Sequence, residues 1–205
     1  TPPIVEAFSL TGRHQRADRV QLARHRSEGI AEDVTRDTLA DVGRKHARYG
    51  AAAVLPWLLS LLRGDVVSAG RLQVERRAGA DGHALHVPET GPLHPEAVDA
   101  ALDRARALTG ADGFSCTSWL LDPVLREQLP ETNIARFAER FRLVREAADP
   151  EAGSRSAAQF VFVRPLSEVL DPAVVVPVTR LERLVALRLR DGSGWREPVG
   201  VLTPR

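Results

Sequence analysis

The segment from Ala84 to Glu96, Ala-Leu-His-Val-Pro-Glu-Thr-Gly-Pro-Leu-His-Pro-Glu, constrains the fold of this chain of 205 residues more than any other part. Its alternating start predicts a short strand, its Gly-Pro pair a tight turn, and Pro95 the first turn of a helix. The first backbone N–H groups of a helix have no partner inside it and form a ready anion site. We therefore expect a strand, a phosphate-sized turn and a helix in succession, with His86 and Glu89 beside the turn.

The flanking segments extend this unit into a sheet. Alternating apolar and polar residues over 71–77 and 83–87, joined by Gly-Ala-Asp-Gly, predict a β-hairpin. The helix after the turn has one apolar face, formed by Val98, Ala101, Leu102 and Ala105. Residues 114–121 then predict a strand that ends at an Asp-Pro pair.

Further helices and strands are predicted on both sides of this unit. The N-terminal helices are expected over 16–27, 35–48 and 51–62, and Asp33 or Thr35 is suited to cap the second. The C-terminal helices are expected over 124–129, 132–140 and 181–189, and Thr179 is suited to cap the last. A strand pair is expected over 141–144 and 159–163. This alternation predicts an α/β fold with a mixed β-sheet flanked by helices.

Composition narrows the classes of function. The 28 basic and 27 acidic residues nearly balance, which gives no argument for a nucleic-acid partner or an anionic membrane. A single cysteine, Cys116, excludes an intrachain disulfide and a thiolate-rich zinc site, and no two histidines have the spacing of a helical metal site, so we expect no metal. The longest apolar run is too short to cross a bilayer, and the arginine-rich composition is typical of actinobacterial proteins. We expect a cytoplasmic protein.

Several segments resemble one family in order and spacing. They are Gly-Arg-Leu-Gln-Val-Glu-Arg from Gly70, His-Val-Pro-Glu-Thr-Gly-Pro-Leu from His86, Cys-Thr-Ser-Trp-Leu-Leu-Asp-Pro from Cys116, Asn-Ile-Ala-Arg-Phe from Asn133 and Phe-Val-Phe-Val-Arg-Pro from Phe160. Together they resemble the GNAT-like C-terminal domain of bacterial acyltransferase-domain proteins. Residues 29–44 resemble the end of the GNAT-like lobe that usually precedes this domain. We therefore divide the chain into a mostly helical remnant of a shortened N-terminal lobe, 1–63, and the GNAT-like C-terminal domain, 64–205.

The resemblance implies a fold and an activity. A GNAT-like mixed sheet holds the pantetheine arm of an acyl thioester in a splayed cleft between two strands, here 84–87 and 114–120. The implied donor is acyl-CoA or the phosphopantetheine of an acyl carrier protein, and the implied acceptor is a small-molecule amine or hydroxyl, as in natural-product biosynthesis. The chain departs from ordinary GNAT enzymes at the turn, which lacks their arginine or glutamine and paired glycines, and where Pro92 and Pro95 remove two donors. The only tyrosine, Tyr49, lies far upstream of the motif.

Acyl transfer needs a base, donors to an oxyanion and an acid for the leaving thiolate. Given the resemblance, His86 is the first candidate for the base, because the pKa of an unperturbed imidazole is near neutral. Glu89 is a second candidate, or holds an acceptor ammonium, and Ser118 is a candidate donor to the thiolate. Each has a purely structural alternative: an outward-facing strand histidine, a carboxylate at a helix start, and a serine that bonds neighbouring backbone. Cys116 is a weak candidate nucleophile, since a buried strand cysteine is usually inert.

The remaining candidates bind the donor. They are Thr90, Gly91 and Leu93 as backbone donors to phosphate, Trp119 as a wall of the pantetheine or acyl slot, and Asn133 and Arg136 as contacts to a phosphate or carboxylate. The alternatives are a tryptophan in the core and a surface ion pair between Arg136 and Glu131 or Glu139.

Two further classes of function stay open at this point. The first is a non-catalytic GNAT-derived module that binds a thioester or a carrier protein without turning it over. The second is a GNAT cleft recruited for another tailoring reaction. The apolar residues 51–62 are explained equally well by a buried helix and by a homodimer interface.

Overall fold

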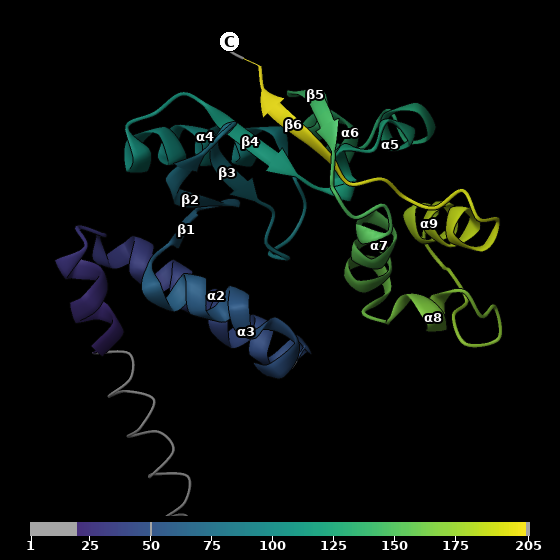
Figure 1. Cartoon of the computed structure of the whole chain (residues 1–205), viewed down its shortest axis with the longest axis horizontal. Coiled ribbons are helices and arrows are strands. Elements are labelled where there is room, and N and C mark those ends of the chain that lie inside the picture. Colours follow the sequence, from purple (N-terminus) through teal and green to yellow (C-terminus); the bar gives the residue numbers. More distant parts are fainter. Residues whose placement is uncertain (1–19, 50, 204–205) are drawn as a thin grey trace, which may run out of the picture.

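The computed structural model describes residues 20–49 and 51–203. Within these ranges the chain forms one six-stranded sheet with helices against it, in the order β1-β2-β3-β4-β6-β5 (Figure 1). The strands are β1 Val66–Ala69, β2 Leu72–Gly79, β3 Gly82–His86, β4 Phe114–Thr117, β5 Phe141–Glu146 and β6 Pro198–Leu202. β3 and β4 run parallel and every other neighbouring pair is antiparallel, so the predicted mixed sheet is confirmed.

The centre of the sheet carries the predicted strand–turn–helix–strand unit. The hairpin of β2 and β3 is confirmed, and α4, Pro95–Thr109, connects β3 to β4. The predicted apolar face of α4 is buried against the sheet, and Gly110 ends the helix in a left-handed conformation. A helical connection between parallel strands is the expected consequence of this order.

β3 and β4 stay together only at their beginnings. His83 pairs with Phe114 and Ala84 with Ser115, and the pairing stops there. Beyond this point β3 stays with β2, while β4 pairs with β6 through Cys116 and Thr117. The two strands therefore separate toward their carboxyl ends, and the gap lies at the turn that leads into α4.

Helices cover the sheet and extend past its edge. They are α2 Glu32–Tyr49, α3 Ala51–Arg63, α5 Pro123–Gln128, α6 Asn133–Ala138, α7 Ala152–Phe162, α8 Leu166–Val169 and α9 Arg180–Arg190, with a short 3-10 helix, η1, at Trp119–Leu121. Residues 20–27 are also helical; the earlier part of the helix predicted over 16–27 lies outside the described residues. α2 and α3 lie on one side of Figure 1, and α7, α8 and α9 on the other.

Three sequence-based predictions of local structure are wrong. Residues 159–163 end helix α7 instead of forming a strand, because the small residues Gly153, Ala157 and Ala158 bury one helical face of that segment. The partner of β5 is β6, which was not predicted. The strand predicted over 114–121 ends at Thr117, and Ser118 is instead the N-cap of η1.

The predicted helix caps are correct at one helix and wrong at another. Thr179 caps α9 as predicted, in a capping box with Glu182. α2 instead begins at Glu32, and the Thr35 hydroxyl donates to the carbonyl of Ala31 from inside the helix, so Thr35 is not the cap. The predicted stop of α2 at Gly50 lies outside the described residues.

Two apolar clusters form the core. One lies between the sheet and α4 and includes Leu72, Val74, Leu85 and Phe114. The other is built on Trp119 and Trp195, whose rings meet edge to face at 5.6 Å, and extends into α7 and α9. The division of the chain near residue 63 stays a prediction.

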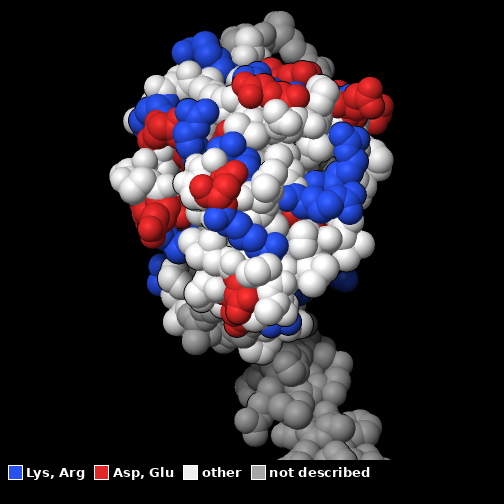
Figure 2. All heavy atoms as spheres, turned by 90° about the vertical axis from the view of Figure 1, so that its right-hand side faces the viewer, with Lys and Arg blue, Asp and Glu red and all other residues white. Residues whose placement is uncertain are grey.

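The surface carries mixed charge on the side where α8 and α9 lie. There, basic and acidic side chains are interspersed rather than gathered by sign (Figure 2). Ion pairs such as Arg164 with Glu168 account for part of this mixing. Among the described helices, none combines the length and the apolar character that a bilayer crossing requires.

Candidate active site

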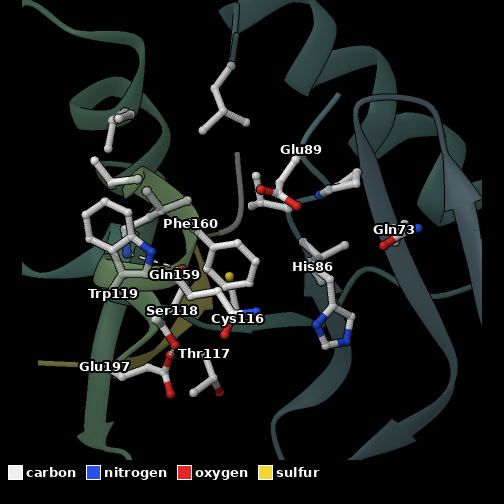
Figure 3. A pocket seen from close by; sticks show the side chains of 18 of the residues that line it. Gln73, His86, Glu89, Cys116, Thr117, Ser118, Trp119, Gln159, Phe160 and Glu197 are labelled. Carbon is white, nitrogen blue, oxygen red and sulfur yellow. Dashed lines mark hydrogen bonds between the residues drawn. The ribbon is translucent and has the colours of Figure 1, made fainter. Parts of the chain in front are cut away.

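A cavity of about 810 Å³ opens where β3 and β4 separate. Its floor is formed by the ends of the two strands, one wall by α2, α3 and the turn before α4, and the other by η1 and α7 (Figure 3). Of the predicted site residues, seven line it: His86, Glu89, Gly91, Leu93, Cys116, Ser118 and Trp119. The fold thus brings together both halves of the predicted site, which are separated by α4 in the sequence.

His86 is held by two neighbours. Its Nε2 lies 2.9 Å from Oε1 of Glu75, and its ring meets the Trp57 ring at 4.6 Å, edge to face. The hydrogen bond from His86 lowers the pKa of Glu75, so that carboxylate is ionised at neutral pH. A carboxylate only accepts, so Nε2 carries a proton and Nδ1, which has no partner among the described residues, is the basic atom. In this tautomer, Nδ1 is the atom of His86 that can accept a proton.

Glu89 is surrounded by donors. The Tyr49 hydroxyl donates to it at 2.6 Å, and Lys45 and Arg48 lie 3.5 and 3.4 Å from its oxygens. Burial, and then the hydrogen bond to Glu89, raises the pKa of Tyr49 well above its usual value, so the phenol stays protonated. Glu89 lies in the loop before Pro95, the first residue of α4, so its carboxylate is not in the first turn of that helix.

Tyr49 also lies in the cavity wall, although it is far from the motif in the sequence. Its ring meets Phe160 edge to face at 6.4 Å, and the Lys45 ammonium lies 5.6 Å from both ring centres. The fold therefore brings Tyr49 to this site, although it lies 40 positions before Glu89 in the sequence.

The turn between β3 and α4 is fixed by one arginine. The Arg71 guanidinium donates to the carbonyls of Pro88, Gly91 and Pro92, at 2.8, 2.5 and 3.0 Å. Gly91 has a φ of +118°, which a side chain would strain, and it faces open space. Because the carbonyls turn toward Arg71, the N–H groups of Gly91 and Leu93 are left without an acceptor within the described part of the chain. They are the donors this turn can offer an anion.

Three predicted donor-binding residues lie outside the cavity lining. Thr90 is exposed and its N–H already donates to Pro88 at 2.9 Å. Asn133 lies 3.2 Å from Nδ1 of His94, just before α4. Arg136 is exposed, and neither Glu131 nor Glu139 pairs with it in the structure.

The opposite wall is partly apolar, and it also carries the Glu197 carboxylate, whose Oε1 accepts a hydrogen bond from Ser156 Oγ at 2.9 Å. Cys116 is buried, and its burial raises the pKa of the thiol to about 12, which leaves it protonated at neutral pH and a poor nucleophile. The Ser118 Oγ accepts the N–H of Leu120 at 3.1 Å and caps η1, which leaves its own proton available. Trp119 is 4% exposed and belongs to the second core cluster while bordering the cavity.

Two buried polar atoms at the cavity have no hydrogen-bond partner within the described part of the chain. They are Nε1 of Trp57 and Oε1 of Gln73, and both residues line the cavity. Buried polar groups are normally satisfied, so each is a candidate contact for a bound molecule. Trp57, Gln73, Glu75 and Arg71 were not singled out from the sequence. For Glu75 a signal was present, because a regular hairpin with 79 opposite 82 would place 75 opposite 86.

No group of three or more histidine, cysteine, aspartate or glutamate side chains in the described ranges is arranged to hold a metal ion. The polar groups of the cavity include a histidine, the ion-paired carboxylate of Glu89, the carboxylates of Glu182 and Glu197, and hydrogen-bond donors. Such a set is suited to acid–base and acyl chemistry on a bound organic molecule.

A mixed sheet with two parallel strands that separate beside a helix N-terminus defines an α/β protein with a cavity at that point. The GNAT-like C-terminal domain family matches residues 19–202, and the chain belongs to that family. No curated protein matches it significantly.

Solved acyltransferase structures are similar in fold and sequence. One, in complex with CoA and 10C-teicoplanin, is 30% identical with a TM-score of 0.75, covering 91% of this chain and 63% of its own. Another, in complex with decanoyl-CoA and teicoplanin, is 31% identical with a TM-score of 0.74 and the same coverage. A third, with decanoyl-CoA, is 31% identical with a TM-score of 0.71, covering 87% of this chain and 60% of its own. The chain thus spans less than two thirds of the length of these acyltransferases.

Proposed function

We propose that this protein transfers an acyl group from a thioester, acyl-CoA or an acyl carrier protein, to an amine or hydroxyl of a small molecule. One observation carries the proposal: the oriented base His86 lies in the cavity where β3 and β4 separate. The acyltransferases of similar fold that bind CoA, decanoyl-CoA and teicoplanin support it, and teicoplanin makes tailoring of a natural product the favoured context.

The donor would lie between the separated strand ends. Past Ala84 and Ser115 the facing backbone edges of β3 and β4 are no longer paired with each other, so amides of a pantetheine arm can bond there. The N–H groups of Gly91 and Leu93 and the start of α4 then face the phosphates. This turn offers few donors, and a carrier-bound phosphopantetheine, with its single phosphate, would need fewer than CoA does.

The residues around the cavity supply each step of a direct transfer. Nδ1 of His86 takes a proton as the acceptor attacks the thioester carbonyl, and the bond to sulfur then breaks. The unpartnered Nε1–H of Trp57 is a donor for the carbonyl oxygen as it becomes negative. The Ser118 hydroxyl, and not the Cys116 thiol, is the group we assign to the departing thiolate.

Calorimetry with CoA and with a phosphopantetheinylated carrier protein tests the donor site. We expect binding by the wild type and its loss in Gly91→Trp, because an indole at this position occupies the space before the turn. Gly192→Trp is the matched control, since Gly192 also has a positive φ, of +83°, and open space around it. Binding of neither ligand by the wild type would refute the acyltransferase proposal.

A second candidate, a binding module without turnover, is favoured by one observation. Glu89, which an acceptor ammonium would use, is already neutralised by Lys45, Arg48 and Tyr49. Thioester consumption distinguishes the two: a module binds decanoyl-CoA but releases no free CoA when an acceptor is added. A cytoplasmic location and self-association through α3 stay predictions.

A further inference from the structure

Gln73 lies in the cavity wall, and one of the two polar atoms of its side-chain amide has a hydrogen-bond partner among the described residues. It is 2% exposed, and its Nε2 donates to Oδ2 of Asp41 at 2.9 Å. Its Oε1 has no partner although the residue borders the cavity. In Figure 3 the oxygen of Gln73 is on the side of the cavity and the nitrogen is turned away from it. A buried acceptor is therefore open to whatever the cavity binds.

Asp41 determines which atom of the amide faces the cavity. Asp41 is 2% exposed, and Arg44 lies 3.3 Å from its other oxygen, so both oxygens are engaged. An ionised carboxylate accepts hydrogen bonds and cannot donate them. The amide must therefore present its NH₂ group to Asp41, and the orientation that would offer NH₂ to the cavity is disfavoured.

Gln73 and the proposed base belong to one small area of the sheet. Gln73 stands opposite His86 in the antiparallel β2–β3 ladder, so their side chains are on the same face. Glu75, two residues along β2, shares that face and holds His86 Nε2. The two acceptors, Nδ1 of His86 and Oε1 of Gln73, thus belong to side chains that are neighbours on one face of the sheet, and each side chain is fixed at its other polar atom by a carboxylate.

We infer that Gln73, oriented by Asp41, selects a primary amine over a hydroxyl as the acyl acceptor. A neutral amine has two protons on the attacking nitrogen, and a hydroxyl has one on the attacking oxygen. As the nitrogen forms its bond to the thioester carbon, one proton goes to His86 Nδ1. The other stays on nitrogen, donated to Gln73 Oε1, and remains in the product amide. The C–S bond breaks, the sulfur leaves as a thiolate that accepts a hydrogen bond from the Ser118 hydroxyl, and the proton held by His86 is then released to solvent. An attacking hydroxyl gives its single proton to His86 and leaves Gln73 unpaired.

The inference rests on the proposed function, and its test compares two acceptors of matched shape. Decanoyl-CoA is the donor, and benzylamine and benzyl alcohol are the acceptor probes. We expect Gln73→Leu to lower the amine-to-alcohol ratio of kcat/KM about tenfold, because one hydrogen bond to the amine is lost. Asp41→Asn should lower the ratio in the same direction, because an asparagine amide can donate to Gln73 and turn its NH₂ toward the cavity. Equal losses for both acceptors would overturn the inference and leave Gln73 a structural residue.

A binding measurement keeps the inference testable without turnover. The side-chain amide of Gln73 can be followed by isotope-edited NMR, with its signal assigned by its loss in Gln73→Leu. We expect benzylamine at alkaline pH to shift this signal and benzyl alcohol at the same concentration to leave it unchanged. A shift in a protein that consumes no thioester would refute the proposed function alone. No amine-specific shift in a protein that acylates benzylamine would refute the inference alone.

Discussion

The two walls of the cavity differ in the polar groups that they carry. On the β3 side, His86, Glu89 and Gln73 are each held by a partner from β2 or α2. On the β4 side, the thiol of Cys116 is buried and neutral, the Ser118 Oγ accepts the N–H of Leu120, and the Glu197 carboxylate accepts a hydrogen bond from Ser156. A nucleophile that must lose a proton needs a fixed base, and His86 is on the β3 side. We therefore propose that the acceptor approaches from the β3 wall and that the acyl chain lies against the β4 wall.

Replacing the proposed base gives the largest expected effect. His86→Ala should lower kcat for acyl transfer by roughly 10²–10⁴, the usual contribution of a positioned base, with the Kd for CoA unchanged. His94→Ala is the matched control, because His94 is exposed and lies outside the cavity lining. An unchanged kcat in His86→Ala, measured by release of free CoA, would remove the base from the β3 wall.

The partner of His86 should matter less than His86 itself. Glu75→Gln keeps the shape but removes the charge, and we expect kcat to fall about tenfold, from the loss of one hydrogen bond to a charged group. The pKa of Glu75 is lowered in the folded protein, so its carboxylate stabilises the fold above the unfolded pKa. That contribution disappears as the pH falls through the lower, folded pKa.

The stability difference between wild type and Glu75→Gln should therefore shrink on acidification. Urea unfolding at pH of about 7 and about 3 measures it, with Glu96→Gln, an exposed glutamate in the first turn of α4, as control. A difference that stays constant with pH would show that His86 does not lower the pKa of Glu75.

Tyr49 lies on the β3 side of the cavity and carries a proton, so replacing it tests the difference between the two walls. Tyr49→Phe removes one hydrogen bond to Glu89 and should cost about 1 kcal/mol of stability in chemical unfolding. Lys45 and Arg48 still neutralise Glu89, so we expect kcat to change less than threefold, or about 0.7 kcal/mol. A hundredfold loss of kcat would instead identify Tyr49 as the acid for the thiolate and move that role from Ser118.

The smallest effect is expected at Cys116. Because burial raises the pKa of the thiol to about 12, iodoacetamide at neutral pH should leave the native protein unlabelled and label it fully after unfolding. Mass spectrometry of intact protein measures this directly. Rapid labelling of the native protein would make Cys116 a candidate nucleophile again and would contradict the proposed difference between the two walls.

Local signals predicted much of the fold correctly. The hairpin, α4 with its buried face and the cap of α9 all depend on turn residues and periodicity within short windows. The strand predicted over 159–163 fails for the same reason. Phe-Val-Phe-Val alternates locally, but the small residues that bury this helix lie outside that window. β6 lies between β4 and β5 and pairs with both, so its strand conformation depends on partners that are distant in the sequence.

The family, the mixed sheet and the strand–turn–helix unit that carries His86 could be predicted from the sequence, because neighbouring residues encode these features. The contacts that set the chemistry of the site form only when distant elements pack together. Glu75 holds His86 although a register shift places Gln73 opposite it, and α2 brings Asp41 and Tyr49 to the same cavity. The hairpin register offered a signal for Glu75, but Asp41 and Tyr49 lie 32 and 40 positions from their partners, and a single sequence carries no local signal for contacts at that distance.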